Sequence, residues 1–570
     1  MDDRSVENLT RYAAQRLTRR DFAKRTAIFG IAIPVLGSLL AACGSDDSED
    51  TPAASAPTQP ATGSGGGDEA TATSGTTAEP TAAGTDATAT ESTTDADGDM
   101  QLVIAQTADL QALYPGVYSS RQSANIMLQM YEGVVLRDDD MTFVPGLAES
   151  WERVDELTWQ FNLRKGVTYH NGKPLVADDV KLSYEEVVIH PETGARRSLA
   201  NSIDKVEVVD DHTVHVITKY PYSPLLTKVV NLEILNAETY AEVGVEGVST
   251  QPNGTGPFRF VEWKQGERVV LEPNPDYWGG PPALSSLVFV PIPENATRSA
   301  AVESGTVQIA AEMPAQFAAT SREGVEIAEA TGTRVFYVGL NVSMEPFTDV
   351  KVRQALNFGV NVPEIVDALL GGKAEVLRGP LFQKVFGYSP DIEGFHYDPD
   401  KAKQLLDEAG LGEGFDTTLD VSPTFKEIAE AIAGQLAEIN VRIAVNVMEN
   451  EALYNKYEQG GSEMYLSSWG TSEMDADTTY STQFLSTRNT VYTTYSREDL
   501  DDLIMKAAGE VDEQARLDFY KLATEIIVED APWIFLYTPV EIYAVRSNVQ
   551  NWNARSDSRF NLMETKVEKA

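Results

Sequence analysis

A long polar tract divides this chain and constrains its fold more than any other feature of the sequence. From Gly44 to Asp99 the residues are mostly Thr, Ala, Ser, Gly, Pro and acids, with almost no large apolar side chain. Such a segment does not bury enough apolar surface to offset the entropy lost on ordering. No Lys or Arg lies between Arg25 and Arg121, so its acidic groups repel one another and extend it. We therefore predict a disordered acidic tether over residues 44–99, between a short leader and one large body.

The leader has the pattern of an export signal. Several arginines precede an apolar segment, Thr26–Ala42, which ends in the run Leu40–Cys43. This order of basic, apolar and small-residue regions is typical of a signal peptide. A retained transmembrane helix is the alternative, but a membrane span needs about 20 predominantly apolar residues, and Gly30 and Pro34 interrupt this shorter segment. Residues 1–43 are therefore predicted to direct export.

The run Leu40-Ala41-Ala42-Cys43 resembles the bacterial lipobox, in which the cysteine receives a diacylglyceryl group and becomes the first residue after cleavage. Cys43 is the only cysteine in the chain, so an internal disulfide is excluded. A buried apolar thiol is the alternative, but Cys43 lies between an apolar segment and a polar tract rather than in a core pattern. Two acyl chains give stable anchoring. We expect lipidation at Cys43 and a position at the outer face of the cytoplasmic membrane or in the periplasm.

Two adjacent arginines, Arg19 and Arg20, add a second signal. Together with Phe22 and Lys24 they resemble the twin-arginine export motif, whose pathway carries proteins that are already folded. The alternative is an ordinary basic region in which two arginines happen to be adjacent. The twin-arginine interpretation is preferred.

The body, from Met100 to Ala570, is too large for one hydrophobic core. Cores stop growing beyond about 250–300 residues, so two or more lobes are expected. The formal net charge of −42 disfavours nucleic acid and anionic membrane surfaces as partners, because binding to either relies on clusters of Lys and Arg. We therefore expect a soluble, acidic, multi-lobed body that binds no nucleic acid.

Strand-like and helix-like segments alternate along the body. Runs of β-branched and aromatic residues predict strands, and apolar residues at three-to-four spacing predict helices. Asp398 and Pro399 fit the N-cap and first position of a helix, and Gly410 fits its C-terminal end. An α/β architecture follows. The predicted strands include Gln101–Ala105, Val206–Val209, Val214–Ile217, Val269–Leu271 and Leu287–Val290, and the predicted helices include Ala177–Val188, Val350–Phe358, Pro399–Ala409, Phe425–Glu438 and Glu513–Glu529.

The motifs of several enzyme classes are absent from the sequence. No G-x-S-x-G, H-E-x-x-H or G-x-x-x-x-G-K-[ST] occurs, which argues against a hydrolase, a zinc peptidase and an ATPase. His212 and His215 point to opposite faces of a predicted strand and are poor partners for one metal ion. We expect no catalytic residue, no metal site and no cofactor. A surface hydrolase is the weaker alternative.

Six short motifs follow one another through nearly the whole body. They are Tyr131–Val135, Leu157–Asp179, Gly254–Phe258, Asn274–Gly280, Val352–Asn357 and Tyr397–Leu406. In this order they resemble the bacterial extracellular solute-binding proteins of family 5, the substrate-binding lipoproteins of peptide and nickel ABC transporters. Each motif alone is weak, and the resemblance depends on their order.

Most of these motifs predict structure rather than chemistry. Gly254 and Gly256 indicate a tight turn and not a phosphate-binding loop, because Arg259 stands where a third glycine belongs. Tyr277-Trp278 is interpreted as an aromatic plug beneath a turn. Arg353 is expected to satisfy a structural partner, since a partly buried guanidinium needs its donors filled.

The resemblance implies a type II periplasmic-binding-protein-like α/β fold, with two lobes, an extra subdomain inserted in lobe I and a two-segment hinge. Lobe I with its subdomain is expected over residues 100–334, lobe II over 335–536 and a return to lobe I over 537–570. The crossings are expected near Thr333–Tyr337 and Phe535–Pro539. Ligands of such proteins bind between the lobes, where pockets commonly form.

The resemblance also implies a function. The chain is expected to act as a monomer that captures a peptide or peptide-like solute, such as an oligopeptide, a dipeptide or glutathione. It then delivers this ligand to an ABC permease and its ATPase subunits. The alternatives are a different solute, such as chelated nickel or an oligosaccharide, and a surface sensor that does not deliver its ligand.

The resemblance implies ligand contacts around Trp469. Peptide-binding members of the family carry, three residues after this tryptophan, an aspartate that pairs with the ligand α-amine, but this chain has Ser472 there. Glu473 or Asp475 is then expected to supply the charge. The spacing from Trp469 to Asp475 and Asp477 resembles the glutathione-binding branch. The alternative is a core tryptophan followed by a solvated acidic loop.

Three further residues are candidate ligand contacts. Tyr114 matches a position where relatives bring an aromatic or apolar group to the cleft. Arg378 and Arg488 are candidates for a ligand carboxylate, because guanidinium groups bind carboxylates through two hydrogen bonds. The alternative for each arginine is an exposed loop position.

Overall fold

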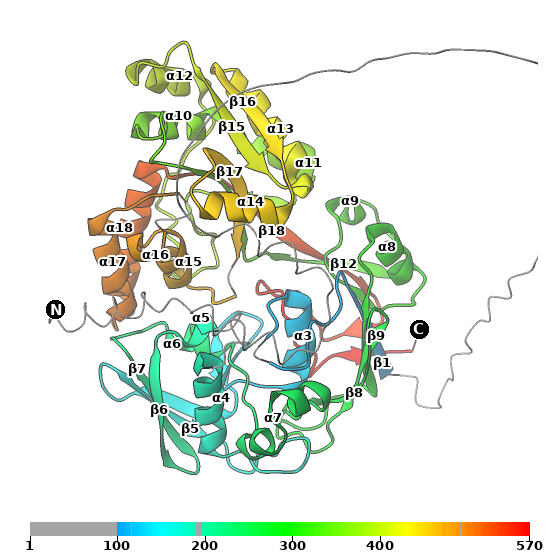
Figure 1. The fold of residues 1–570 in the computed structure, drawn as a ribbon. Coiled ribbons are helices and arrows are strands. Elements are labelled where there is room, and N and C mark those ends of the chain that lie inside the picture. Colours follow the sequence, from blue (N-terminus) through cyan, green and yellow to red (C-terminus); the bar gives the residue numbers. More distant parts are fainter. Residues whose placement is uncertain (1–99, 116, 190–196, 471, 490–492, 570) are drawn as a thin grey trace, which may run out of the picture. The chain divides into compact units, whose positions relative to one another are not determined.

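The computed structural model describes residues 100–569 except 116, 190–196, 471 and 490–492 (Figure 1). The leader over residues 1–43 and the tether over 44–99 lie outside the described residues, and so do the predictions made for Arg19, Arg20 and Cys43. Among the residues that the structure describes, no helix combines the length and the apolar character needed to span a membrane.

One large mixed sheet connects the two halves of the described body. Its strands follow the order β16-β15-β17-β13-β18-β11-β1-β10-β9-β8, and β12 and β14 also pair with β18. The strands are β1 (Gln101–Gln106), β8 (Phe258–Lys264), β9 (Arg268–Pro273), β10 (Ser286–Pro291), β11 (Ile309–Ala310), β12 (Val325–Thr331), β13 (Arg334–Leu340), β14 (Ala374–Val376), β15 (Phe415–Val421), β16 (Val441–Val447), β17 (Met464–Gly470) and β18 (Trp533–Arg546).

Strand β18 forms the hinge with β12 and β13. Its first part pairs with β13, from Tyr537 opposite Phe336, and its second part pairs with β12, from Val540 opposite Thr331. Only Gly332 and Thr333 separate β12 from β13. A Cβ on Gly332 would lie 2.8 Å from the carbonyl oxygen of Pro539, so a side chain there would push the two segments apart. The chain therefore crosses twice between the lobes, side by side.

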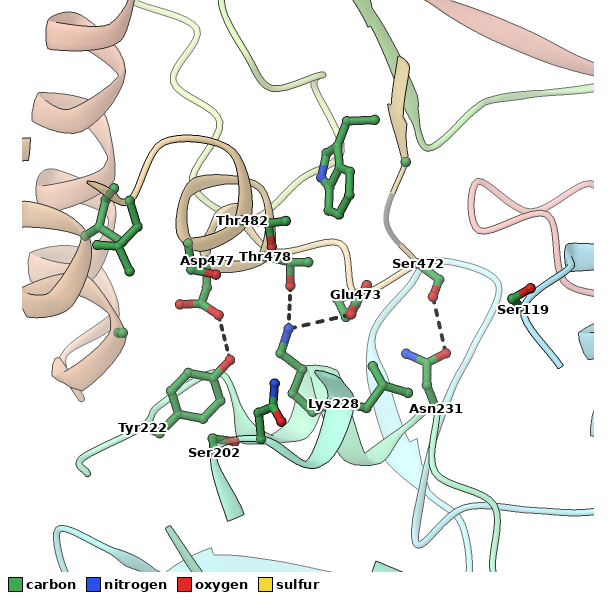
Figure 2. A pocket seen from close by; sticks show the side chains of 18 of the residues that line it. Ser119, Ser202, Tyr222, Lys228, Asn231, Ser472, Glu473, Asp477, Thr478 and Thr482 are labelled. Carbon is green, nitrogen blue, oxygen red and sulfur yellow. Dashed lines mark hydrogen bonds and ion pairs between the residues drawn. The ribbon is translucent and has the colours of Figure 1, made fainter. Parts of the chain in front are cut away.

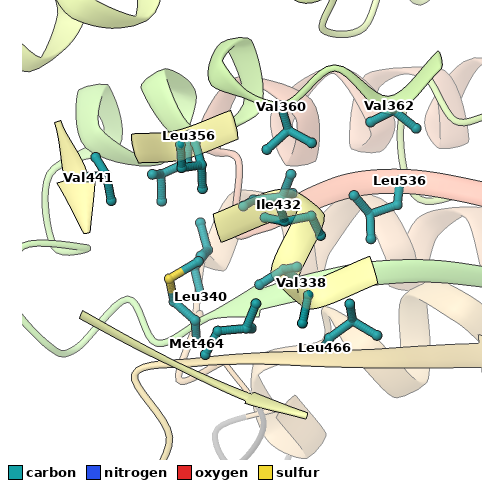
Figure 3. Close-up of a cluster of buried hydrophobic side chains, with 14 of the residues drawn as sticks. Val338, Leu340, Leu356, Val360, Val362, Ile432, Val441, Met464, Leu466 and Leu536 are labelled. Atoms are coloured by element: carbon teal, nitrogen blue, oxygen red, sulfur yellow. The ribbon is translucent and has the colours of Figure 1, made fainter. Parts of the chain in front are cut away.

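Separate hydrophobic clusters give each lobe its own core. The buried members of two clusters lie within residues 335–537 and form lobe II. Figure 3 shows one of them, in which Val338 and Leu536 of the sheet pack against Leu356 and Ile432 of the covering helices. Lobe I contains two clusters whose buried members lie within 102–317 and 542–562. Because each of these four clusters draws its buried members from one lobe, the lobes are suited to move as rigid bodies.

A four-stranded antiparallel sheet forms the extra subdomain of lobe I. Its order is β4-β5-β7-β6, with β4 over Ala148–Arg153, β5 over Thr158–Leu163, β6 over Ile203–Asp210 and β7 over Thr213–Thr218. Helix α4 (Ala177–Ile189) covers one face (Figure 1), and a further cluster fills the space between them. This subdomain completes the type II two-lobe fold that the resemblance implied.

Helices cover the sheets, and several begin at side-chain caps. The carboxylate of Asp398 accepts a 2.9 Å hydrogen bond from the backbone N–H of Lys401, which satisfies a donor of the first turn of α12. Besides α4, the described α-helices are α3 (Arg121–Met130), α5 (Arg197–Ala200), α6 (Leu225–Val229), α7 (Ala237–Thr250), α8 (Asn295–Glu303), α9 (Ala315–Ala318), α10 (Val350–Gly359), α11 (Val362–Leu370), α12 (Pro399–Glu408), α13 (Lys426–Ala437), α14 (Asn450–Glu458), α15 (Ala476–Gln483), α16 (Ser486–Asn489), α17 (Glu498–Gly509) and α18 (Glu513–Asp530). Short strands complete the fold: β2 (Val135–Arg137), β3 (Phe143–Pro145), β19 (Val549–Gln550) and β20 (Lys566–Val567).

The predicted helices and strands are confirmed, with ends that differ by a few residues at most. Strand β1 extends the prediction to Gln106, and α13 begins at Lys426, because Pro423–Phe425 forms a 3₁₀ turn before it. Gly410 has the positive φ of +77° expected where a helix ends.

The structural roles predicted for Tyr277-Trp278 and Arg353 are confirmed, but the tight turn predicted at Gly254 and Gly256 is not formed. These glycines instead pack against the end of α3, where Cβ atoms on them would lie 2.0 and 2.5 Å from backbone oxygens. Tyr277 and Trp278 donate hydrogen bonds of 2.7 and 3.0 Å to the carboxylate of Glu132, so they seal a buried acid. The guanidinium of Arg353 donates to backbone oxygens that include Asp530 O, at 2.7 Å. The donor groups of Tyr277, Trp278 and Arg353 are therefore used within the protein.

Candidate ligand-binding cavity

A cavity of about 420 Å³ lies between residues of both lobes. Lobe I contributes side chains from residues 118–120, 199–202 and 220–231, together with Arg559. Lobe II contributes the end of β17, the segment that follows it, α15 and part of α17. Hydroxyl and amide groups and aromatic rings make up much of the lining, and Figure 2 shows the polar side chains that meet there.

Strand β17 places Trp469 in the cavity lining. In the sheet Trp469 lies opposite Val335 of β13, one residue beyond the start of that strand. The tryptophan is therefore held beside the hinge. The β17 backbone then continues to Gly470, which also lines the cavity. The ring of Trp469 packs partly against the lobe II core.

The turn before α15 carries the acidic residues. Phe386 donates its backbone N–H to Met474 O at 3.0 Å and accepts from Ala476 N at 2.9 Å, which ties this turn to lobe II. Met474 adopts a left-handed conformation with φ of +56°. The carboxylate of Asp475 caps α15 by accepting from the N–H of Asp477 at 2.9 Å. The first turn of the helix then directs Asp477 and Thr478 to the cavity.

Lys228 of α6 reaches from lobe I to this turn of lobe II. Its Nζ donates a 2.6 Å hydrogen bond to Thr478 Oγ1 and lies 3.5 Å from Glu473 Oε1. Figure 2 shows the ammonium between these two side chains. Lys228 and Glu473 are each 8% exposed. The pair is therefore largely shielded from water, where ion pairs are screened less than at the surface.

Four more hydrogen bonds join the lobes beside the cavity. Tyr222 donates from its hydroxyl to Asp477 Oδ2 at 2.6 Å, and Ser472 donates to Asn231 Oδ1 at 3.4 Å. Arg137 of lobe I donates to the backbone oxygen of Ser472 at 2.6 Å and also to that of Glu473. Lobe I therefore contacts both side chains and backbone oxygens of lobe II.

Burial dominates the electrostatics of Asp477. Loss of water raises the pKa of this carboxyl above its usual range, and the nearby charge of Asp475 raises the pKa further. Lys228, Tyr222 and Arg516 act in the opposite direction. The pKa of Tyr222 is raised as well, first by burial and then by the charge of Asp477. The hydroxyl therefore stays protonated and available as a donor.

Polar atoms from both lobes lie shielded from solvent in the lining. Ser202 Oγ and Trp469 Nε1 have no hydrogen-bond partner among the described residues. A buried polar group without a partner costs about 1–3 kcal/mol. Both groups line the cavity, so a molecule bound there is in a position to satisfy them.

Of the predicted site residues, the structure brings Trp469, Glu473 and Asp477 together in this lining. Asp475 lies elsewhere: both of its carboxylate oxygens accept from Arg516 Nη2, at 2.7 and 2.8 Å. It lines a different cavity, of about 670 Å³, together with Arg516. The carboxylate is therefore occupied by a structural partner.

Of the remaining predicted residues, Tyr114 and Arg378 lie away from the cavity. Tyr114 is 1% exposed and belongs to a lobe I core cluster, so its ring does not reach the lining. Arg378 lines a cavity of about 500 Å³ within lobe II, where its Nη1 donates to Pro390 O at 3.3 Å. Arg488 belongs to α16, and its side chain is outside the described part of the chain.

Several lining residues carry no signal in the sequence. Lys228, Tyr222, Asn231 and Ser202 come from irregular or short segments of lobe I with no recognisable motif. Helix α6 has only five residues, which is too short for a periodic pattern. Only the folded chain reveals that Lys228 faces the acids of lobe II.

Comparisons with known proteins agree with this architecture. The family model "Bacterial extracellular solute-binding proteins, family 5 Middle" matches residues 142–490. The glutathione-binding protein GsiB of Pectobacterium atrosepticum is 30% identical over 478 residues, which cover 80% of this chain and 92% of that protein.

Solved structures show the same fold. HbpA2 from Haemophilus parasuis superimposes with a TM-score of 0.76 and 26% identity, over 82% of this chain and 100% of that one. The periplasmic binding protein DppA from Helicobacter pylori, in complex with the peptide STSA, has a TM-score of 0.69 and 25% identity, over 82% and 98% of the two chains. Membership implies a location outside the cytoplasm. By sequence and by fold, this chain belongs to the bacterial extracellular solute-binding proteins of family 5.

Proposed function

We propose that this protein is the substrate-binding component of an ABC importer, and that it captures a peptide or peptide-like solute in the cavity between its lobes. The observation that carries the proposal is the cavity itself, whose lining combines Trp469, Glu473 and Asp477 of lobe II with Tyr222 and Lys228 of lobe I. Preferred ligand sites are concave, with a few well-placed polar groups. A ligand that touches both lobes stabilises the closed state.

The named relatives support the class of solute. The Helicobacter pylori DppA structure contains a peptide, and the Pectobacterium GsiB protein is named for glutathione. Both resemble this chain over most of its length. A peptide-sized ligand also suits a cavity of about 420 Å³, which falls in the usual range of about 300–1,000 Å³ for small-molecule sites.

The proposed cycle is a hinge motion. The two crossings at β12–β13 and β18 are short paired segments between lobes with separate cores. The lobes, proposed as residues 100–334 with 537–570 and residues 335–536, open and close around these segments. The closed, loaded protein then delivers its ligand to the permease, and the partner ATPase subunits drive transport.

We propose the remaining parts of the chain for export and attachment. Arg19 and Arg20 direct the folded protein through the twin-arginine pathway, and Cys43 carries the lipid that holds it at the membrane. The acidic segment over residues 44–99 connects this anchor to the body and lets the protein act as a monomer near its permease.

Native mass spectrometry of the full-length protein, purified without refolding, tests the proposal. We expect a mass excess from a retained small solute, which dissociates on collisional activation and is identified as a peptide or peptide-like compound. A protein that retains nothing and binds no component of a peptide digest would contradict the proposal. Loss of uptake of the identified solute on gene deletion separates transport from sensing.

A further inference from the structure

The acids of the cavity already have partners within the protein. Glu473 pairs with Lys228, and Asp477 accepts the 2.6 Å hydrogen bond from Tyr222. Asp475, the third acid of this segment, is occupied by Arg516 outside the cavity lining. No carboxylate of this segment is left as the natural partner of a ligand ammonium group.

Lys228 makes the same place unfavourable for a second cation. A ligand amine that approached Glu473 would come close to the Lys228 ammonium, and like charges repel strongly in a poorly hydrated site. Displacement of Lys228 would leave Glu473 as a buried charge without this partner, which is strongly destabilising. Lys228 is 8% exposed and its Nζ also binds Thr478, so the ammonium is fixed by two contacts.

The groups that remain suit a different chemistry. Trp469 Nε1 and Ser202 Oγ are shielded and have no hydrogen-bond partner among the described residues. An indole N–H only donates, so Trp469 requires an acceptor oxygen on the ligand. Hydroxyl and amide side chains of both lobes surround these groups, and Figure 2 shows Ser119 and Thr482 on opposite sides of the space.

We propose that the cavity selects a solute that lacks a cationic amine and binds it through hydroxyl, amide and aromatic contacts, with Lys228 as the residue that excludes amines. This inference rests on the proposed function, because it names the chemistry of the ligand for that cavity. Two sources share the chemistry: peptides with blocked amines, and neutral oligosaccharides.

A paired competition experiment tests the inference. A chymotryptic casein digest is divided, one half is treated with acetic anhydride so that every amine becomes an amide, and the halves are mixed in equal amounts. The full-length protein is added, and the retained compounds are identified by mass spectrometry, together with a parallel mixture of neutral oligosaccharides. We expect acetylated peptides to be retained at least tenfold over their free-amine counterparts. Equal or preferential retention of the free-amine peptides would overturn the inference.

A substitution of the excluding residue gives the second test. Lys228→Met removes the cation beside Glu473. We therefore expect the retention of free-amine peptides, relative to acetylated ones, to rise at least tenfold. Lys228→Arg keeps a cation and should keep the wild-type preference. The matched control is Lys205→Met, which breaks an exposed pair with Glu207 at 2.5 Å and should change nothing. An unchanged preference in a folded Lys228→Met protein, checked by circular dichroism, would also overturn the inference.

The outcomes separate the inference from the proposed function. Retention of free-amine peptides alone overturns the inference and leaves a peptide-binding protein. Retention of neutral oligosaccharides alone supports the inference and overturns the peptide function. No retention in any arm contradicts both.

Discussion

The hydroxyl of Tyr222 in lobe I donates a 2.6 Å hydrogen bond to Asp477 at the first turn of α15 in lobe II. Both side chains are buried, and both line the cavity. The bond therefore exists only when the lobes are together, so it stabilises the closed state and not the open one. The same logic applies to the contact between Lys228 and Thr478.

Tyr222→Phe should weaken closure and binding. The change leaves the carboxylate of Asp477 without its donor, and a hydrogen bond to a charged group contributes about 1.5–3 kcal/mol. We expect at least a tenfold loss of affinity for the peptide fraction that the wild type retains, measured by calorimetry. The control is Tyr454→Phe, which removes a hydroxyl from an exposed tyrosine of α14. Equal affinities of wild type and Tyr222→Phe would show that this bond does not couple the lobes.

Trp469→Phe should separate binding from stability. Phenylalanine keeps one aromatic ring at this position but removes the unpartnered N–H. The removed polar group offsets part of the packing lost with the smaller ring, so the stability of the free protein should change little. Affinity should fall about five- to tenfold if a ligand oxygen accepts from Nε1. Trp263→Phe is the control. It removes the 3.1 Å hydrogen bond from Trp263 Nε1 to Asp109 and lies outside the cavity lining, so it should lower stability and leave affinity unchanged. A loss of stability without a loss of affinity in Trp469→Phe would assign this indole to the core.

Asp475→Asn should act on folding. The guanidinium of Arg516 would lose a partner while still buried, at a cost of about 3–5 kcal/mol in the free energy of unfolding, measured by urea denaturation. The double variant Asp475→Asn with Arg516→Met removes the orphaned charge and should recover part of that loss. If Asp475→Asn instead unfolds like the wild type but loses ligand affinity, the carboxylate is a ligand contact after all.

Glu132 should give the protein a distinct pH dependence of stability. Burial raises the pKa of this carboxyl from 4.5 to about 7, despite hydrogen bonds from Tyr277, Trp278 and Thr255 that lower it. Between pH 4.5 and 7 the unfolded chain releases the proton while the folded chain keeps it, so the folded state loses stability as pH rises through this window. At about 1.4 kcal/mol per pKa unit, the loss approaches about 3 kcal/mol. Glu132→Gln removes this contribution. The free energy of unfolding of the variant, measured by urea denaturation, should therefore rise relative to that of the wild type between pH 5 and 7.5. If the difference in unfolding free energy between the two proteins stays constant with pH, the raised pKa of Glu132 is contradicted.

The sequence predicted most of the fold, because its signals are local or belong to the family. Alternating β-branched runs, the cap at Asp398 and the glycine at Gly410 depend on a few neighbouring residues, and the structure confirms them. The family motifs are mainly structural for the same reason. Their residues, such as Gly254 and Arg353, hold backbone segments in place.

The site could be predicted only in part, because charge partners are a property of the folded chain. The segment after β17 was expected to contain the site, and Trp469, Glu473 and Asp477 do line the cavity. Asp475 looked equivalent in sequence, yet Arg516, 41 residues away, occupies it. Lys228 is 250 residues from Thr478, and nothing near it in the sequence reveals that contact.

A structure of the full-length protein with its retained solute would locate the ligand. We predict a ligand in the cavity between Tyr222 and Trp469, with an acceptor oxygen within hydrogen-bond distance of Trp469 Nε1 and contacts to both lobes. A ligand in the larger cavity beside Asp475 and Arg516, or one held by a single lobe, would contradict this prediction.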